Sequence, residues 1–99
     1  MGELLDVDPR MLHLPSSRVT GADPAKLARQ TARFGKSVRG MPVIWVTRGR
    51  GGALIINDGV TRATRVAKLL PGQTVRVEVI DEKPRWDLSP YPKLGDKLP

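Results

Sequence analysis

The 99-residue sequence predicts an α+β fold in which two main helices pack on a small mixed sheet. Two stretches with apolar side chains at helical spacing predict the helices. Runs rich in β-branched residues, bounded by glycine and proline turns, predict the strands. In chain order the main elements are therefore a helix, a hairpin, a second helix and a closing strand.

The first residues predict little regular structure. Residues 1–8 are mixed acidic and apolar, which suits either an unpaired arm or a first edge strand. Residues 11–14 indicate a short strand that ends in the turn at Pro15. His13, the only histidine, is expected to cap or pack near this N-terminal strand.

The first helix should begin at Asp23 and Pro24. An aspartate side chain can cap the free amides of a first turn, and proline at the first helical position loses no hydrogen bond. The helix should run to about Phe34 and end at Gly35. Its expected inner face consists of Leu27, Thr31 and Phe34, with Ala28 and Ala32 alongside, and its cations should stay largely solvated.

The hairpin follows at residues 43–57. Residues 43–47 have the strongest β propensity in the chain, and the glycine-rich residues 48–52 turn the chain back toward residues 53–57. The cationic tip lacks the Gly-Lys-Ser/Thr ending of a phosphate loop and opens no helix. We therefore interpret the tip as an exposed turn.

The last strand and the tail differ in character. Residues 74–80 alternate valines with polar residues, which predicts a strand with one buried face. Residues 81–99 contain four prolines, four cations and four anions, so we expect residues 83–99 to form a Pro-rich extended tail beside a domain that spans residues 1–82. Trp86 and Tyr91 either fold back on the domain, which we favour for Trp86, or contact another protein.

Composition limits the partners and the chemistry. The net charge is +7, and between residues 24 and 76 eleven Lys and Arg residues face Asp58 alone. Such a basic segment favours nucleic acid, a nucleotide or an anionic membrane as partner, and the alternative is a solvated basic surface. The chain has no cysteine, which excludes disulfides, thiolate metal sites and thiol nucleophiles.

Targeting signals are missing from the sequence as given. No apolar run approaches the roughly 20 residues that a membrane-spanning helix needs. The first residues are too acidic for a signal peptide. We therefore expect a soluble, cytoplasmic protein with no membrane partner.

The junction between the hairpin and the second helix predicts an anion site. Residues 54–56 form a short apolar strand that Asn57-Asp58-Gly59 ends, and Asp58 is the expected N-cap of the helix. Outward-pointing amides at a helix start bind phosphate, and Arg62 and Arg65 lie beside them in the sequence. The expected polar side of this helix carries Thr61, Thr64, Arg65 and Lys68.

Two motifs resemble those of the ParB and sulfiredoxin superfamily, often called the ParB-like nuclease domain. Residues 55–63, Ile-Ile-Asn-Asp-Gly-Val-Thr-Arg-Ala, are similar to the family's strand and Gly-x-x-Arg helix start. Residues 40–46, Gly-Met-Pro-Val-Ile-Trp-Val, are similar to its upstream box. The resemblance covers roughly residues 12–82 and implies a small stand-alone member with a ParB/sulfiredoxin-like fold.

The resemblance implies a nucleotide-phosphate site at Gly59, Thr61 and Arg62. Val60 stands where sulfiredoxins carry their reactive cysteine, so their chemistry is excluded. Val60 and Thr61 also replace a glutamate and an arginine of the chromosome-segregation ParB proteins. In the upstream box, the matching site residues are Arg39, Gly40 and Pro42.

Three functions follow from these observations. The first is a module that binds a nucleotide or a nucleic-acid backbone at the Asp58–Gly59 helix start without turnover, and we favour it. The second is a toxin-type nuclease in which Arg62 and Arg65 stabilise charge in the transition state and Asp58 activates water or holds Mg²⁺. One carboxylate makes a poor metal site, so no metal ligands are predicted. The third is a basic domain that binds an acidic protein.

Overall fold

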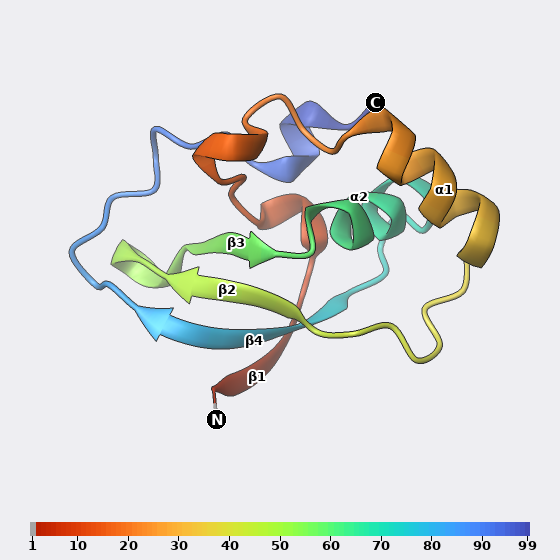
Figure 1. Cartoon of the computed structure of the whole chain (residues 1–99). Coiled ribbons are helices and arrows are strands. Elements are labelled where there is room, and N and C mark those ends of the chain that lie inside the picture. Colours follow the sequence, from red (N-terminus) through yellow and green to blue (C-terminus); the bar gives the residue numbers. More distant parts are fainter. Residues whose placement is uncertain (1) are drawn as a thin grey trace.

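The computed structural model describes residues 2–99 and has one four-stranded mixed sheet covered by two helices (Figure 1). The strands lie in the order β1-β4-β2-β3. They are β1 (Glu3–Val7), β2 (Ile44–Arg48), β3 (Leu54–Asp58) and β4 (Val75–Glu82). The helices α1 (Pro24–Phe34) and α2 (Val60–Leu69) lie on one side of the sheet. The predicted α+β class, with a small mixed sheet and two main helices, is confirmed.

The strand pairing explains why the sheet is mixed. β2 and β3 form the predicted antiparallel hairpin, with a bulge between Trp45 and Val46. β4 pairs in parallel with β2 and antiparallel with β1. A parallel pair needs a crossover connection, and α2 lies in the segment that brings the chain from β3 to β4. The start of α2 is thereby placed at the end of β3.

One hydrophobic core lies between the sheet and α2. Val75, Val77 and Val79 are buried while Arg76 between them is exposed, which confirms the predicted alternation in β4. β2, β3 and α2 contribute the remaining centre of the core: Ile44, Val46, Leu54, Ile56, Ala63, Val66 and Ala67.

The first helix has the predicted ends and a different inner face. The side chain of Asp23 accepts a hydrogen bond from the Ala25 amide at 2.9 Å, and Gly35 ends the helix. Leu27 is the residue of α1 that is buried, whereas Phe34 is 42% exposed. The expectation that Phe34 and the alanines pack inward is wrong, because α1 lies against α2 and does not cover the centre of the sheet.

The structure decides what residues 2–8 form and contradicts the expectation for residues 11–14. β1 is an edge strand, as one of the two expectations for residues 1–8 had it; Met1 lies outside the described residues. The strand expected at residues 11–14 is wrong, because Met11 ends the short 3₁₀ helix η1 (Pro9–Met11) and His13 forms only isolated bridges to Ile55 and Lys93. His13 is buried beside β3, and its Nδ1 lies 2.8 Å from the Tyr91 carbonyl oxygen.

Residues 83–99 pack on the domain, so the expectation of an extended, unpacked tail is wrong. Leu88 and Leu94 are buried, and the Leu94 amide donates to the Leu12 carbonyl at 2.8 Å. The prolines favour extended backbone, but the two leucines anchor the segment because they remove apolar surface from water. The rings of Trp86 and Tyr91 pack edge to face at 5.6 Å. Within the described residues, four short 3₁₀ helices complete the fold: η1, η2 (Ser16–Arg18), η3 (Arg50–Gly52) and η4 (Leu94–Lys97).

Candidate anion-binding site

The junction between β3 and α2 is a tight glycine turn. β3 continues to Asp58, and Gly59 then serves as the N-cap of α2 with φ 111°. The expectation that Asp58 caps the helix is wrong, because Asp58 is the last residue of β3 and no side chain caps this helix start. The first intrahelical hydrogen bond joins the Ala63 amide to the Gly59 carbonyl, so the amides of residues 60–62 have no partner within the helix.

Gly59 is required at this position for two reasons. Its positive φ is a backbone conformation that L side chains rarely adopt. An added Cβ would also lie 3.0 Å from Nη2 of Arg62 and 3.0 Å from Cγ1 of Ile44. Ile44 and Arg62 can therefore pack this closely on the turn because residue 59 has no side chain.

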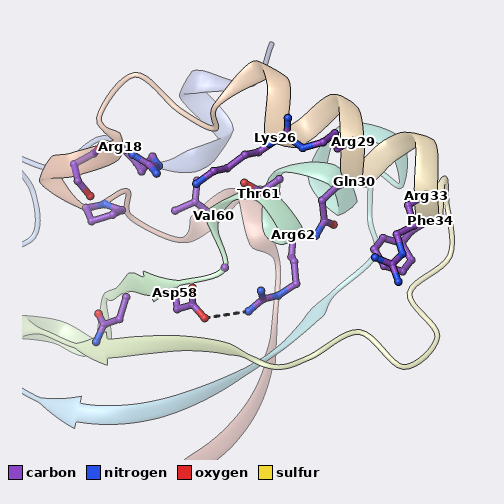
Figure 2. Close-up of a pocket in the computed structure, with 14 residues that line it drawn as sticks. Arg18, Lys26, Arg29, Gln30, Arg33, Phe34, Asp58, Val60, Thr61 and Arg62 are labelled. Atoms are coloured by element: carbon purple, nitrogen blue, oxygen red, sulfur yellow. Dashed lines mark hydrogen bonds and ion pairs between the residues drawn. The ribbon is translucent and has the colours of Figure 1, made fainter.

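A cavity of about 530 Å³ lies between α1 and this junction (Figure 2). Asn57, Asp58, Gly59, Val60 and Thr61 line it on the side of β3 and α2. The cationic residues around it are Arg18 from η2, Lys26, Arg29 and Arg33 from α1, and Arg62 from α2. Five cations against one carboxylate give the cavity walls a formal charge of +4, so the cavity has the field that attracts an anion.

The cations of α1 are the residues that sequence reasoning missed. Lys26, Arg29 and Arg33 are exposed, as expected, and all three also line the cavity, which the sequence did not predict. A signal was available, because residues three and four apart share one face of a helix. Arg18 gave no comparable signal, since it lies in a 3₁₀ turn whose path the sequence does not predict.

Arg62 is held at the floor of the cavity. Its Nη2 donates to the Val43 carbonyl at 3.2 Å and lies 3.6 Å from Oδ2 of Asp58. The side chain is 20% exposed, and its buried Nε has no hydrogen-bond partner. A buried donor without a partner carries a free-energy cost. The exposed fifth of the Arg62 side chain is the part that a ligand in the cavity can contact.

Asp58 is the carboxylate that lines the cavity, and its side chain is 63% exposed. Within residues 2–99, no group of three or more His, Cys, Asp or Glu residues can hold a metal ion. The residues around the cavity do not fit Mg²⁺, because five neighbouring cations oppose a divalent ion and Mg²⁺ needs oxygen ligands. Asp58 is instead the ion-pair partner of Arg62.

Arg65 does not reach the cavity that the helix start lines. It is only 2% exposed, and its Nη1 donates to the carbonyl oxygens of Gly35 at 2.8 Å and Ser37 at 2.7 Å. The expectation that Arg65 and Thr64 lie on an exposed face is wrong, because both are buried; the Thr64 hydroxyl donates to the Val60 carbonyl at 2.7 Å. Burial lowers the pKa of the Arg65 guanidinium, which still stays charged because arginine is the strongest base among side chains.

The upstream box lies beside this site. Arg39, Gly40 and Pro42 line a second cavity of about 240 Å³. Arg33 and Arg62 line both cavities, which therefore adjoin. The fold thus brings Arg39, Gly40 and Pro42 next to the start of α2, although the β2–β3 hairpin separates them along the chain.

Comparison with other proteins gives no family for this chain. No protein-family model matches the sequence, and a search of curated proteins finds no match either. The ParB and sulfiredoxin resemblance stays a prediction that depends on the two motifs. Among the described residues, no helix has both the length and the apolar character needed to cross a membrane.

Proposed function

We propose that this protein binds a phosphate-containing ligand, either a nucleotide or the backbone of a nucleic acid, in the 530 Å³ cavity at the start of α2. The observation that carries the proposal is that five cationic side chains line one cavity together with a helix start that no side chain caps. The cations come from η2, α1 and α2, so the cluster depends on the fold and is not a run of charge along the sequence.

The chemistry of these groups suits phosphate. Free amides at a helix start and the helix dipole favour an anion. Guanidinium groups add charge-assisted hydrogen bonds to phosphate oxygens, and arginine can make two of them in parallel. Gly59 lets the turn pack closely on Ile44 and Arg62 and so holds the helix start at the cavity.

The same geometry supports the proposed place of the chain in the ParB and sulfiredoxin superfamily. The family's helix start is implied to bind a nucleotide phosphate, and its matching residues Gly59, Thr61 and Arg62 all line the cavity. The upstream box adjoins them. Binding without turnover fits the site better than catalysis, because the cavity offers one carboxylate as a base and that carboxylate pairs with Arg62.

Amide chemical shifts test this proposal. The labelled protein is titrated with inorganic pyrophosphate, CTP, ATP and a short oligothymidylate. The amides of residues 59–62 should move first, and Arg62→Ala should weaken binding about tenfold, as expected for one lost charge-assisted contact. Stronger binding of one nucleotide than of pyrophosphate would indicate a base site, and preference for the oligonucleotide would indicate a backbone ligand.

Lys68→Ala provides the matched control for Arg62→Ala. Lys68 is an exposed cation on the same helix and does not line the cavity. Its removal should change affinity less than about twofold, the effect of long-range charge screened by salt. Equal losses for the two variants would contradict a specific pocket and favour the reading of a basic surface that meets an acidic protein or any polyanion.

A nuclease is the second candidate, because Asp58 lies on the cavity wall beside a guanidinium that could stabilise a pentacovalent phosphate. The test incubates the protein with plasmid DNA and single-stranded RNA, with and without Mg²⁺. Binding alone predicts no cleavage under any condition. Cleavage that Asp58→Asn abolishes, with the fold intact by circular dichroism, would overturn the assignment as a binding module.

A further inference from the structure

The two halves of α1 are attached to the domain in different ways. In the N-terminal half, Leu27 is buried and supplies an apolar anchor. At the C-terminal end, Phe34 is 42% exposed, and residues 36–40 that follow are all exposed and form no helix or strand. Apolar burial therefore fixes the C-terminal end of α1 less than the N-terminal half, although Arg33 and much of the cavity wall depend on it.

Arg65 supplies the missing attachment from α2. Its Nη1 binds the carbonyl oxygens of Gly35 and Ser37, and its Nε donates to Oε1 of Gln30 at 3.3 Å. The guanidinium carbon also lies 5.4 Å from the centre of the Phe34 ring. One side chain thus contacts α1, its final cap and the segment after it.

The electrostatics of this contact are favourable without an acidic partner. The last carbonyl groups of a helix lack partners within the helix and form the negative end of its dipole. No ion pair within residues 2–99 includes Arg65. The carbonyl of the C-cap Gly35 and that of Ser37, two residues beyond it, balance the charge of the buried guanidinium. Removing the guanidinium would break these part-buried hydrogen bonds and would release the end of α1.

We propose that Arg65 is a positioning residue for the anion site: it fixes the C-terminal end of α1, and with it Arg29 and Arg33, over the start of α2. The effect of Arg65 on ligand binding rests on the proposed function. The attachment of α1 by Arg65 does not. Arg65 acts through the α1 cations and makes no contact with the anion. In this respect it differs from Arg62, which lines the cavity and is held by Val43 and Asp58.

Hydrogen exchange tests the attachment without any ligand. Arg65→Met has a similar reach but no donors, and Arg65→Lys keeps the charge and part of the donor capacity. In Arg65→Met the amides of residues 30–37 should exchange at least about tenfold faster, as in local unfolding of one unit, while those of β2 and β4 stay protected. Lysine should restore part of the protection. Unchanged exchange at residues 30–37 in folded Arg65→Met would overturn the proposal.

A double-mutant cycle tests the link to the site, with inorganic pyrophosphate as the probe. Arg29→Ala should weaken binding about fivefold in the natural sequence and less than about twofold in Arg65→Met, because coupled residues give non-additive effects. Arg62→Ala should cost the same factor in both backgrounds. A purely structural role for Arg65 predicts that Arg29→Ala weakens binding by the same factor in both backgrounds. That result would overturn the positioning role.

The two proposals fail in different ways. If the natural protein does not bind pyrophosphate, a nucleotide or an oligonucleotide, the proposed function fails and the positioning role fails with it, whatever the exchange rates show. If pyrophosphate binds and the cycle is additive, the proposed function stands and only the role of Arg65 is overturned. Thermal unfolding of each variant confirms that binding is measured on folded protein.

Discussion

Arg62 and Arg65 lie one turn apart on the same helix and have opposite surroundings. Arg62 lies at a cavity wall, with one carbonyl contact, one long ion pair and a buried Nε that lacks an acceptor. Arg65 is enclosed, and carbonyl and amide oxygens accept its hydrogen bonds. An arginine whose side chain is partly exposed at a cavity can contact a ligand, whereas one that is enclosed and whose donors are bound by protein oxygens serves the fold.

The largest expected effect is a difference in stability between variants of the two arginines. Arg65→Met should lower the free energy of unfolding by about 3 kcal/mol, because three hydrogen bonds from a buried, charged guanidinium are lost. Arg62→Met should lower it by about 1 kcal/mol, since a single hydrogen bond to a carbonyl is lost. Urea unfolding measures both. Equal losses would show that the two side chains do not differ in structural role.

Gly59→Ala tests how far the surroundings of Arg62 depend on the glycine turn. The new Cβ would press on Nη2 of Arg62 and on Ile44 and would require a strained φ, so we expect a loss of about 2 kcal/mol. Gly72→Ala is the matched control, because Gly72 also has a positive φ but open space around it, and strain alone costs about 1 kcal/mol. Pyrophosphate affinity should fall for Gly59→Ala and stay unchanged for Gly72→Ala.

The smallest expected effect concerns the other end of α1, at Asp23. The hydrogen bond from the Ala25 amide lowers the pKa of the Asp23 carboxyl below its ordinary value of 3.8. A lowered pKa means that the cap stabilises the helix above pH 3.8 and is lost as the pH falls through the folded value. The Ala25 amide shift should titrate with a midpoint below 3.8. A midpoint above that value would contradict the cap.

Elements with strong local signals were predictable from the sequence. The Asp23-Pro24 start and Gly35 end of α1, the hairpin and the alternating valines of β4 all depend on neighbouring residues, and the structure confirms them. The glycine turn at Gly59 was predictable for the same reason. Its role as the cap was missed because strand pairing with β2 extends β3 to Asp58, and that pairing is not local.

The burial of Arg65 and the packing of the tail could not be predicted in this way. Periodicity assigns a charged residue to the solvent side, and only the return of residues 35–37 to α2 supplies the acceptors that bury this one. The prolines of residues 83–99 predict an extended segment, and two leucines are too few to show a periodicity. The burial of Leu88 and Leu94 therefore could not be predicted. The site thus has two parts. Local sequence predicts Gly59 and Arg62, whereas only the tertiary fold brings the cations of α1 to the cavity.

The contact between Leu12 and Leu94 has a consequence for how the chain reaches its native state. The Leu94 amide binds the Leu12 carbonyl, and both side chains belong to the same core. Contacts between residues so distant in sequence require closure of a very long loop, which slows folding. During synthesis the core must wait for Leu94 to leave the ribosome. Refolding in milliseconds to seconds, slower than for a helical bundle of equal length, is the kinetic signature that this closure implies.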